Sequence, residues 1–150
     1  MEKPKKSLRL TDYLEEFWNM HRGDRRFPSL DSIVDEYIDE KTQDDVFIID
    51  VIHQSHNHHF ATRYMGENVQ KLHEDVTDRE NAEKAINNFI EAYKQHFERV
   101  ITSRRPIVQN IEIHQGINKV LKYRQILLPL GDSDNEPINA ILGGMRYKKD

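Results

Sequence analysis

Residues 107–147 read IVQNIEIHQGINKVLKYRQILLPLGDSDNEPINAILGGMRY, and this stretch decides the fold class. Ile107, Ile111 and Ile113 alternate with other residues, which is the period-two pattern of a half-buried strand. Polar turns containing glycine divide the stretch into three strands, at residues 107–114, 121–130 and 138–147. Short turns join antiparallel neighbours, so the stretch predicts a three-stranded antiparallel meander.

Gly143 and Gly144 stand side by side in the last of these strands. A glycine inside a strand marks either a bulge or a place where another part of the molecule approaches closely. The sequence alone leaves both alternatives open.

A strand pair and a long helix precede the meander. The β-branched run at 46–52 (VFIIDVI) predicts a buried strand, and 60–64 is its return strand after the polar turn HQSHNHH. Apolar residues recur at helical spacing over 82–101, and Thr77 with Glu80 fits a capping box in front of them. Together these patterns predict a helical segment that crosses from one strand pair to the meander.

The N-terminal part is predicted to be helical, with Thr11 as the N-cap of a first helix and a second, shorter helix from Ser29. Residues of one apolar face recur three and four apart in the first helix, namely Leu10, Tyr13, Leu14, Phe17 and Trp18. The order of elements predicts an α+β fold with a five-stranded antiparallel sheet, a helical crossing segment and flanking N-terminal helices. The crossing segment is expected to cover one sheet face; the first helix covers the other, packs on a partner chain, or does both.

Composition excludes several classes of protein. The 150 residues suit one compact domain, and the absence of cysteine excludes disulfides, thiolate metal sites and a cysteine nucleophile. The net charge of −4 argues against a dedicated nucleic-acid binder. No apolar run reaches the length of a membrane span, and no secretory signal follows the basic tip. We therefore expect a cytoplasmic protein that binds neither nucleic acid nor membrane.

Beyond the order of elements, several short motifs resemble the PAS-domain superfamily, and in particular a family of short standalone bacterial PAS-like proteins. The matching residues, in chain order, are Trp18, Arg22-Gly23, Arg26-Phe27-Pro28, the strand 46–52, Phe60-x-x-Arg63-x-x-Gly66, Asp75-Val76-Thr77, 125–131 and Ile138-x-x-Ile141-Leu142-Gly143. The chain departs from that family at Asp78, where glycine is usual, and at Ser29-Leu30 after the proline.

This resemblance implies a sensory or ligand-binding module with its ligand between the sheet and the helical segment, and a dimer formed through the N-terminal helix. It divides the chain into a helical extension, residues 1–40, and a PAS-like domain, residues 41–150. The residues assigned to the dimer helix are Leu10, Tyr13, Leu14, Phe17 and Trp18. The resemblance names no cofactor.

Polar residues in or beside strands are the candidates for the ligand pocket: Arg63, Tyr64, Tyr123 and Gln125. Arg63 either orients a carboxylate or other anion, or forms an ion pair with the acidic segment at Asp44 and Asp45.

Four histidines are weak candidates for a metal site because imidazoles at short spacing can bind zinc, nickel or copper: His53, His56, His58 and His59. The alternative is a solvated turn, and no metal is assigned. His96 resembles the haem-binding histidine of some PAS domains, but a lone helical histidine is more often surface or core. Asp50 in its apolar strand is either a buried acid or base, or the partner of an arginine.

The sequence therefore predicts a standalone PAS-like sensory and interaction module in bacterial signalling, which is not an enzyme and acts through a homodimer or a separate signalling protein. One alternative is a small α+β enzyme with an apolar substrate, which a pairing of Asp50 with a histidine would favour. The other is a dimerisation scaffold with no ligand.

Overall fold

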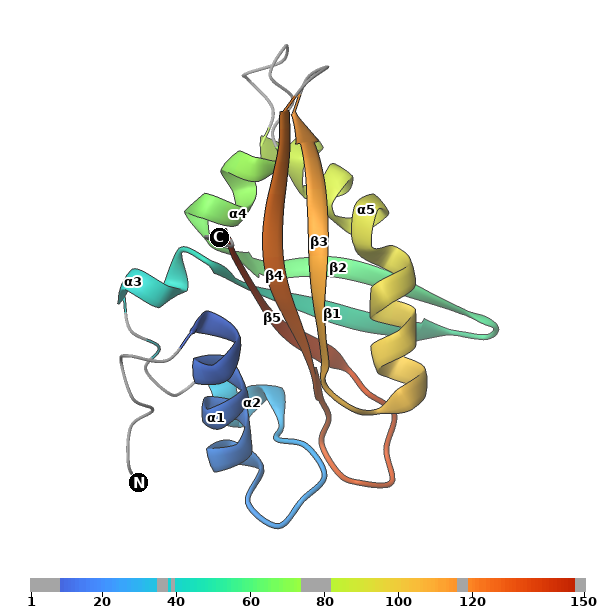
Figure 1. The fold of residues 1–150 in the computed structure, drawn as a ribbon. Helices are drawn as coiled ribbons and strands as arrows, with labels where there is room; N and C mark the ends of the chain where they lie inside the picture. Colours follow the sequence, from blue (N-terminus) through green and yellow to red (C-terminus); the bar gives the residue numbers. More distant parts are fainter. Residues whose placement is uncertain (1–8, 35–37, 39, 74–81, 116–118, 148–150) are drawn as a thin grey trace.

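The computed structural model describes residues 9–34, 38, 40–73, 82–115 and 119–147, and Figure 1 shows its ribbon. Within these ranges five strands form one antiparallel sheet in the order β2-β1-β5-β4-β3. The strands are β1 (Val46–Gln54), β2 (Asn57–Met65), β3 (Ile107–Gln115), β4 (Lys119–Leu130) and β5 (Ala140–Tyr147). The predicted α+β fold with a five-stranded antiparallel sheet is confirmed.

The hairpin of β1 and β2 is longer than the sequence predicts. Pairing runs from Phe47 opposite Met65 to Gln54 opposite Asn57, so only two residues form the turn. The prediction of a turn over 53–59 is wrong because it followed the end of the apolar run. Backbone hydrogen bonds continue a ladder where side chains are polar and exposed.

The helices in the described part are α1 (Leu10–Arg22), α2 (Leu30–Val34), α3 (Glu40–Gln43), α4 (Glu67–Leu72) and α5 (Ala82–Ser103). Arg9, and not Thr11, is the N-cap of α1, and Thr11 is buried inside the first turn. Burying Leu10 is worth about 1.5–3 kcal/mol, more than the ~1 kcal/mol of a side-chain cap, so packing extends the helix backwards. The predicted capping box of Thr77 and Glu80 lies outside the described residues, as does Asp75-Val76-Thr77.

Helix α1 covers one face of the sheet, which we call the outer face (Figure 1). The apolar core on this side is built from α1, the α2 region and alternate strand residues: Leu10, Leu14, Phe17, Trp18, Phe27, Ile33, Ile38, Val46, Ile48, Ile126, Leu128, Leu130, Ile138, Ala140 and Leu142. Trp18 fixes the helix because its indole Nε1 donates a buried 2.8 Å hydrogen bond to the Pro129 carbonyl of β4.

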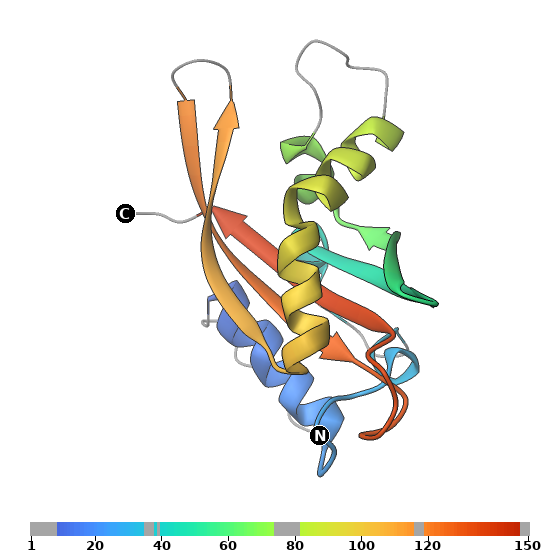
Figure 2. The same ribbon diagram turned by 90° about the vertical axis from the view of Figure 1, so that its right-hand side faces the viewer.

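Helices α4 and α5 cover the opposite, inner face, and Figure 2 shows α5 running across the sheet. The core on this side is Phe47, Ile49, Val51, Val69, Phe89, Tyr93, Phe97, Val100, Ile111, Leu127, Ile141 and Met145. The crossing segment therefore covers one face, as predicted. Of the alternatives left open for the first helix, the structure shows that it covers the other face. None of the helices in the described ranges has the length and apolar character that a membrane crossing needs.

Gly143 and Gly144 allow close approach on both faces. A side chain at Gly143 would collide with the ring of Phe47 on the inner face, and one at Gly144 would meet Leu14 of α1 on the outer face. Pairing of β5 with β4 runs through both glycines without a register shift. Of the two alternatives, close approach is right and the bulge is wrong.

Candidate functional site

A row of two glutamines and a methionine crosses the inner face of the sheet. Gln109 of β3, Gln125 of β4 and Met145 of β5 are direct cross-strand neighbours. The Gln109 Nε2 donates to the Gln125 Oε1 at 2.9 Å, and the Gln125 Nε2 lies 3.9 Å from the Met145 sulfur. We call the two amides the glutamine pair.

Gln125 is the chemically demanding member of this pair because its side chain has no solvent exposure at all. A buried amide is costly unless its hydrogen bonds are made, and a thioether is only a weak acceptor. The Gln125 amide nitrogen therefore supplies the inner face with a donor suited to a carbonyl or hydroxyl oxygen.

Aromatic rings from α5 and β1 pack over the same face. Phe89 contacts Phe47 with ring centroids 4.7 Å apart and Tyr93 with centroids 5.0 Å apart, both in edge-on geometry. The ring centroid of Phe97 lies 5.4 Å from that of Phe60 of β2. The glutamine pair thus lies in a layer that is otherwise apolar and aromatic, the usual composition of a small-molecule site.

His73, the residue after α4, connects this helix to α5 through a half-buried hydrogen bond. Its Nδ1 donates to the Val69 carbonyl at 2.8 Å, so its Nε2 accepts from the Tyr93 hydroxyl at 2.9 Å. Burial lowers the pKa of His73, and burial together with the nearby Tyr123 raises the pKa of Tyr93. Both groups are therefore neutral near pH 7.

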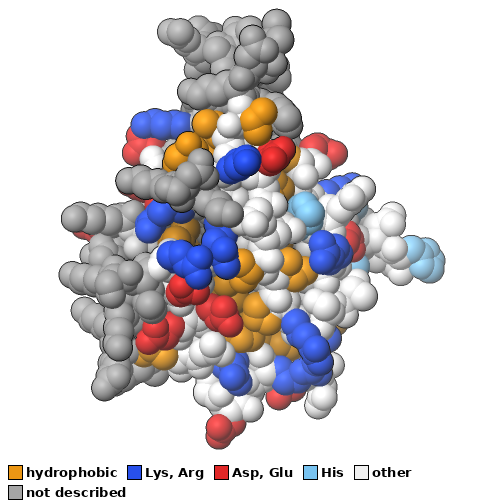
Figure 3. All heavy atoms as spheres, in the orientation of Figure 1, with side chains coloured by type: hydrophobic (Ala, Val, Ile, Leu, Met, Phe, Trp, Pro, Cys, Tyr) orange, Lys and Arg blue, Asp and Glu red, His pale blue; other side chains and the backbone are white. Residues whose placement is uncertain are grey.

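An open recess of about 430 Å³ leads inward beside α4, and we call it the α4 recess. Its lining is Asp45, Asn68, Lys71, Leu72, Tyr123, Met145, Arg146 and Tyr147. Met145 has 1% exposure and also contacts Gln125, so the recess ends on the row that contains the glutamine pair. Figure 3 shows Lys and Arg side chains gathered on the face beside α4 and the end of β5.

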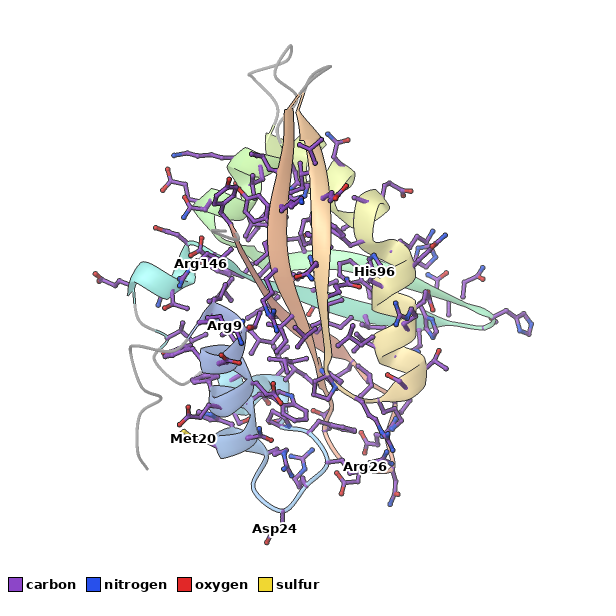
Figure 4. The ribbon with its side chains drawn as sticks, viewed as in Figure 1. Arg9, Met20, Asp24, Arg26, His96 and Arg146 are labelled. Carbon is purple, nitrogen blue, oxygen red and sulfur yellow. The ribbon has the colours of Figure 1, made fainter. Side chains whose placement is uncertain are left out.

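A hydrogen-bonded cluster holds the edge of the α4 recess together. The Asp45 carboxylate accepts from the Asn68 amide at 2.9 Å and from Arg146 Nε at 2.9 Å. Figure 4 shows Arg146 at the end of β5 on the side of α3. Asp45 therefore ties α4 to the last strand of the sheet.

The four predicted pocket residues divide into two pairs. Tyr123 and Gln125 lie on the inner face, where Tyr123 lines the α4 recess and Gln125 belongs to the glutamine pair. Arg63 and Tyr64 are both exposed residues of β2. The Tyr64 hydroxyl donates to the Gln43 carbonyl at 2.8 Å. A role in ligand contact stays a prediction for all four.

Arg63 forms an ion pair, with Asp50 of β1 and not with Asp44 or Asp45. Its Nε donates to the Asp50 carboxylate at 2.8 Å. This hydrogen bond, and then the charge of Asp50, raise the pKa of Arg63. Of the two alternatives for Asp50, the structure therefore shows the partner of an arginine. The carboxylate pairs with Arg63 and not with a histidine, which is the pairing that would favour an enzyme.

The predicted metal candidates lie in the β1–β2 hairpin. His53 Nε2 donates to the Ile138 carbonyl at 2.7 Å, and His58 Nδ1 is 2.8 Å from a Glu98 carboxylate oxygen. His56 lies in the turn and His59 is exposed on β2. Among the residues that the structure describes, no group of three or more His, Cys, Asp or Glu side chains is arranged to hold a metal ion.

His96 is half-buried on α5, near the sheet in the view of Figure 4. Its Nδ1 is buried, and the described part of the chain offers it no hydrogen-bond partner. Burial, and then the charge of Arg99, lower the pKa of His96. Its ring centroid is 6.4 Å from that of Tyr93, so it borders the aromatic layer over the glutamine pair.

The residues predicted to form a dimer helix are mostly core. Leu10, Leu14, Phe17 and Trp18 have 0–5% exposure because the sheet of the same chain covers them, while Tyr13 is only half-buried. In the structure, this stripe therefore packs against the sheet of its own chain.

Several site residues escaped the sequence analysis. Counting by two from Ile107 places Gln109 on the apolar face of β3, so alternation was the available signal. His73, which follows α4, and Tyr93 of α5 are twenty residues apart, and Asp45 and Arg146 are a hundred and one residues apart. No local sequence pattern predicts either contact.

Comparison with known proteins agrees with this geometry. A family model described as PAS domain matches residues 6–146. The chain therefore belongs to the PAS-domain family, whose members are typically sensory modules.

No curated protein matches the sequence. A solved structure described as an RNA-binding light-oxygen-voltage receptor is similar over 69% of this chain, with 14% identity and a TM-score of 0.39. The matched part is 28% of that receptor's chain, so the present chain spans well under half its length. A likeness this distant carries no argument about function.

Proposed function

We propose that this chain is a PAS-type sensory module that binds a small, largely apolar ligand on the inner face of its sheet. The ligand's carbonyl or hydroxyl oxygen accepts a hydrogen bond from the Gln125 amide. The signal then passes by protein contact and not by catalysis.

The observation that carries the proposal is the fully buried amide of Gln125 inside an aromatic layer. A core selected only for stability gains little from an amide whose second partner is a thioether. A binding site uses such a group because one hydrogen bond among apolar contacts fixes the orientation of a ligand. The α4 recess supports the proposal because it connects solvent to Met145, the neighbour of Gln125.

The finer parts of the proposal are bacterial signalling, a cytoplasmic setting, and output through a homodimer or a separate signalling protein. The division into an extension, 1–40, and a PAS-like domain, 41–150, is part of it. Because the α1 stripe is buried within the chain, a dimer has to use other surfaces. Light scattering at micromolar concentration tests the dimer: about twice the 17.9 kDa chain mass supports it, and the single chain mass contradicts it.

Native mass spectrometry of the purified chain tests ligand binding. We expect a species heavier than the polypeptide, and we expect the added mass to disappear in the double variant Gln109→Leu, Gln125→Leu. Replacing both amides leaves neither of them unsatisfied, so the core should stay folded. The control is Gln54→Leu, which changes an exposed glutamine at the end of β1 and should keep the added mass. An added mass that survives in the folded double variant contradicts the assignment of the site.

A further inference from the structure

The α4 recess has an aromatic and aliphatic wall. The rings of Tyr123 and Tyr147 lie 5.7 Å apart in an edge-on arrangement, and Leu72 and Met145 complete the apolar lining. Burial, followed by the charges of Asp45 and Tyr147, raises the pKa of Tyr123, which keeps its phenol neutral. Planar rings fit such a wall because aromatic groups favour offset and edge-on contacts.

Two cationic side chains stand at the rim of the recess. Arg146 and Lys71 have side-chain exposures of 45% and 63%, whereas Asp45 has 12%. Lys71 Nζ is 3.0 Å from the Glu67 carboxylate, an exposed pair on one helix that contributes little and is screened by salt. Each of the two cations therefore has a carboxylate partner, and both cations are accessible from solvent.

Asp45 leaves part of the hydrogen-bonding capacity of Arg146 available to a ligand. One of its carboxylate oxygens accepts from Asn68, and the other accepts from Arg146 through Nε and Nη2. A guanidinium carries five N–H donors, so these contacts use only part of the capacity of Arg146. The same contacts hold the guanidinium in place, which reduces the entropy lost when it binds an anion.

We infer that the α4 recess binds a small planar aromatic carboxylate. The ring lies against Tyr123, Tyr147 and Leu72, and the carboxylate lies at Arg146 and Lys71. This inference goes beyond the proposed function, because the α4 recess meets the row that contains Gln125 only at Met145. A volume of about 430 Å³ falls within the range of small-molecule sites and accommodates two fused rings.

Contact with Met145 connects this ligand to the interior. The Met145 sulfur is the neighbour of the Gln125 amide, and methionine is the most adaptable apolar side chain. A ring seated on Met145 shifts its thioether and so changes the hydrogen bonding of the glutamine pair.

The test titrates the full-length chain with naphthalene-2-carboxylate and with its neutral amide, naphthalene-2-carboxamide, followed by NMR of the methionine methyl and aromatic side-chain signals. We expect the carboxylate to bind with a dissociation constant below about 1 mM. It should bind about three- to tenfold more tightly than the amide, and added salt should reduce this preference. The signals that move should be those of Met145, Tyr123 and Tyr147.

Two variants separate the effect of charge on ligand binding from an effect on folding. Arg146→Gln should abolish the preference for the carboxylate, and Lys71→Gln should reduce it without disturbing Asp45. The control is Arg26→Gln, which removes an exposed arginine well away from Arg146 (Figure 4) and should leave the preference unchanged.

The outcomes distinguish the inference from the proposed function. Equal binding of carboxylate and amide overturns the charge argument but leaves a ligand site. Absence of binding by both probes, or movement only of signals far from Met145, overturns the inference. The proposed function then stands or falls separately, with the native mass spectrum.

Discussion

Gly143 and Gly144 are adjacent in β5 but face opposite layers of the molecule. The missing side chain of Gly143 makes room for the aromatic ring of Phe47 on the inner face, and that of Gly144 for the terminal methyl of Leu14 on the outer face. The two neighbours differ in how easily they can move. A ring buried against Phe89 cannot yield, whereas the end of a leucine side chain can rotate.

Gly143→Ala should therefore destabilise the fold more than Gly144→Ala. We expect a loss of about 1–3 kcal/mol in the free energy of unfolding for Gly143→Ala, because overpacking exceeds the gain of up to ~1 kcal/mol from a stiffer unfolded chain. Urea denaturation of both variants measures the difference. Equal stability of the two variants would show that the Phe47 ring does not fill the space at Gly143.

His73 should make stability depend on pH. Its pKa in the folded chain lies below the ordinary value of 6.5, so the unfolded chain binds its proton first as the pH falls. The full contribution is present above about pH 6.5 and is lost as the pH falls toward the folded-state pKa, with a slope of up to about 1.4 kcal/mol per pH unit.

His73→Gln should flatten this slope, since glutamine does not titrate. The comparison is urea denaturation of both proteins between pH 7.5 and pH 5. His96, whose pKa is also lowered, keeps its own contribution in both. An unchanged slope in the variant contradicts the role assigned to the half-buried contact of His73 with Tyr93.

Helix α1 illustrates what periodicity predicts about an element and what it does not. Spacing of three and four correctly identifies the stripe from Leu10 to Trp18 as apolar. It cannot say which surface covers the stripe, because a sheet of the same chain and a second copy offer the same apolar chemistry. In the structure the stripe packs on β4 and β5 of the same chain. The 2.8 Å hydrogen bond from the Trp18 indole to the Pro129 carbonyl fixes the helix there.

Trp18→Phe tests the attachment of α1. It removes the only N–H of this side chain and leaves the buried Pro129 carbonyl without its indole donor. We expect a loss of about 1–3 kcal/mol in the free energy of unfolding. Glu15→Gln, on the exposed side of the same helix, should stay within about 0.5 kcal/mol of the original chain. If both variants are equally stable, the indole hydrogen bond does not hold the helix.

In the strands, too, the sequence pattern predicts local structure but not contacts between distant residues. Alternation predicts β3, and apolar runs between polar turns predict β4 and β5, whose residues are buried on both faces over much of each strand. Gln125 stands beside apolar residues in the run of β4. These patterns do not reveal that Gln109, Gln125 and Met145 are neighbours, since their alignment depends on the register of three strands. The polar ends of β1 and β2 were missed because exposed ladders have no apolar pattern.

At the scale of the whole molecule, one sheet serves two layers with different tasks. The outer layer is apolar, and α1 and the α2 region close it. The inner layer contains the glutamine pair, the His73–Tyr93 contact and the α4 recess. Stability and the proposed binding are thereby assigned to opposite faces of the same strands.

Removal of residues 1–40 should expose the outer face without removing any residue of the glutamine pair. Ile48, Ile126 and Leu128 are buried against the removed helices. We expect residues 41–150 alone to associate or aggregate, as large exposed apolar patches do. Light scattering of the shortened chain measures this, and a stable monomer would show that the extension is not needed to cover the sheet.

NMR of the side-chain amides of the full chain shows whether a small ligand lies against the glutamine pair. Spectra are compared before and after bound small molecules are removed by unfolding, dialysis and refolding. We expect the Gln109 and Gln125 amide signals to move, while that of the exposed Gln54 stays in place. If small molecules are released but the signals of Gln109 and Gln125 do not change, the ligand lies elsewhere and the account is wrong.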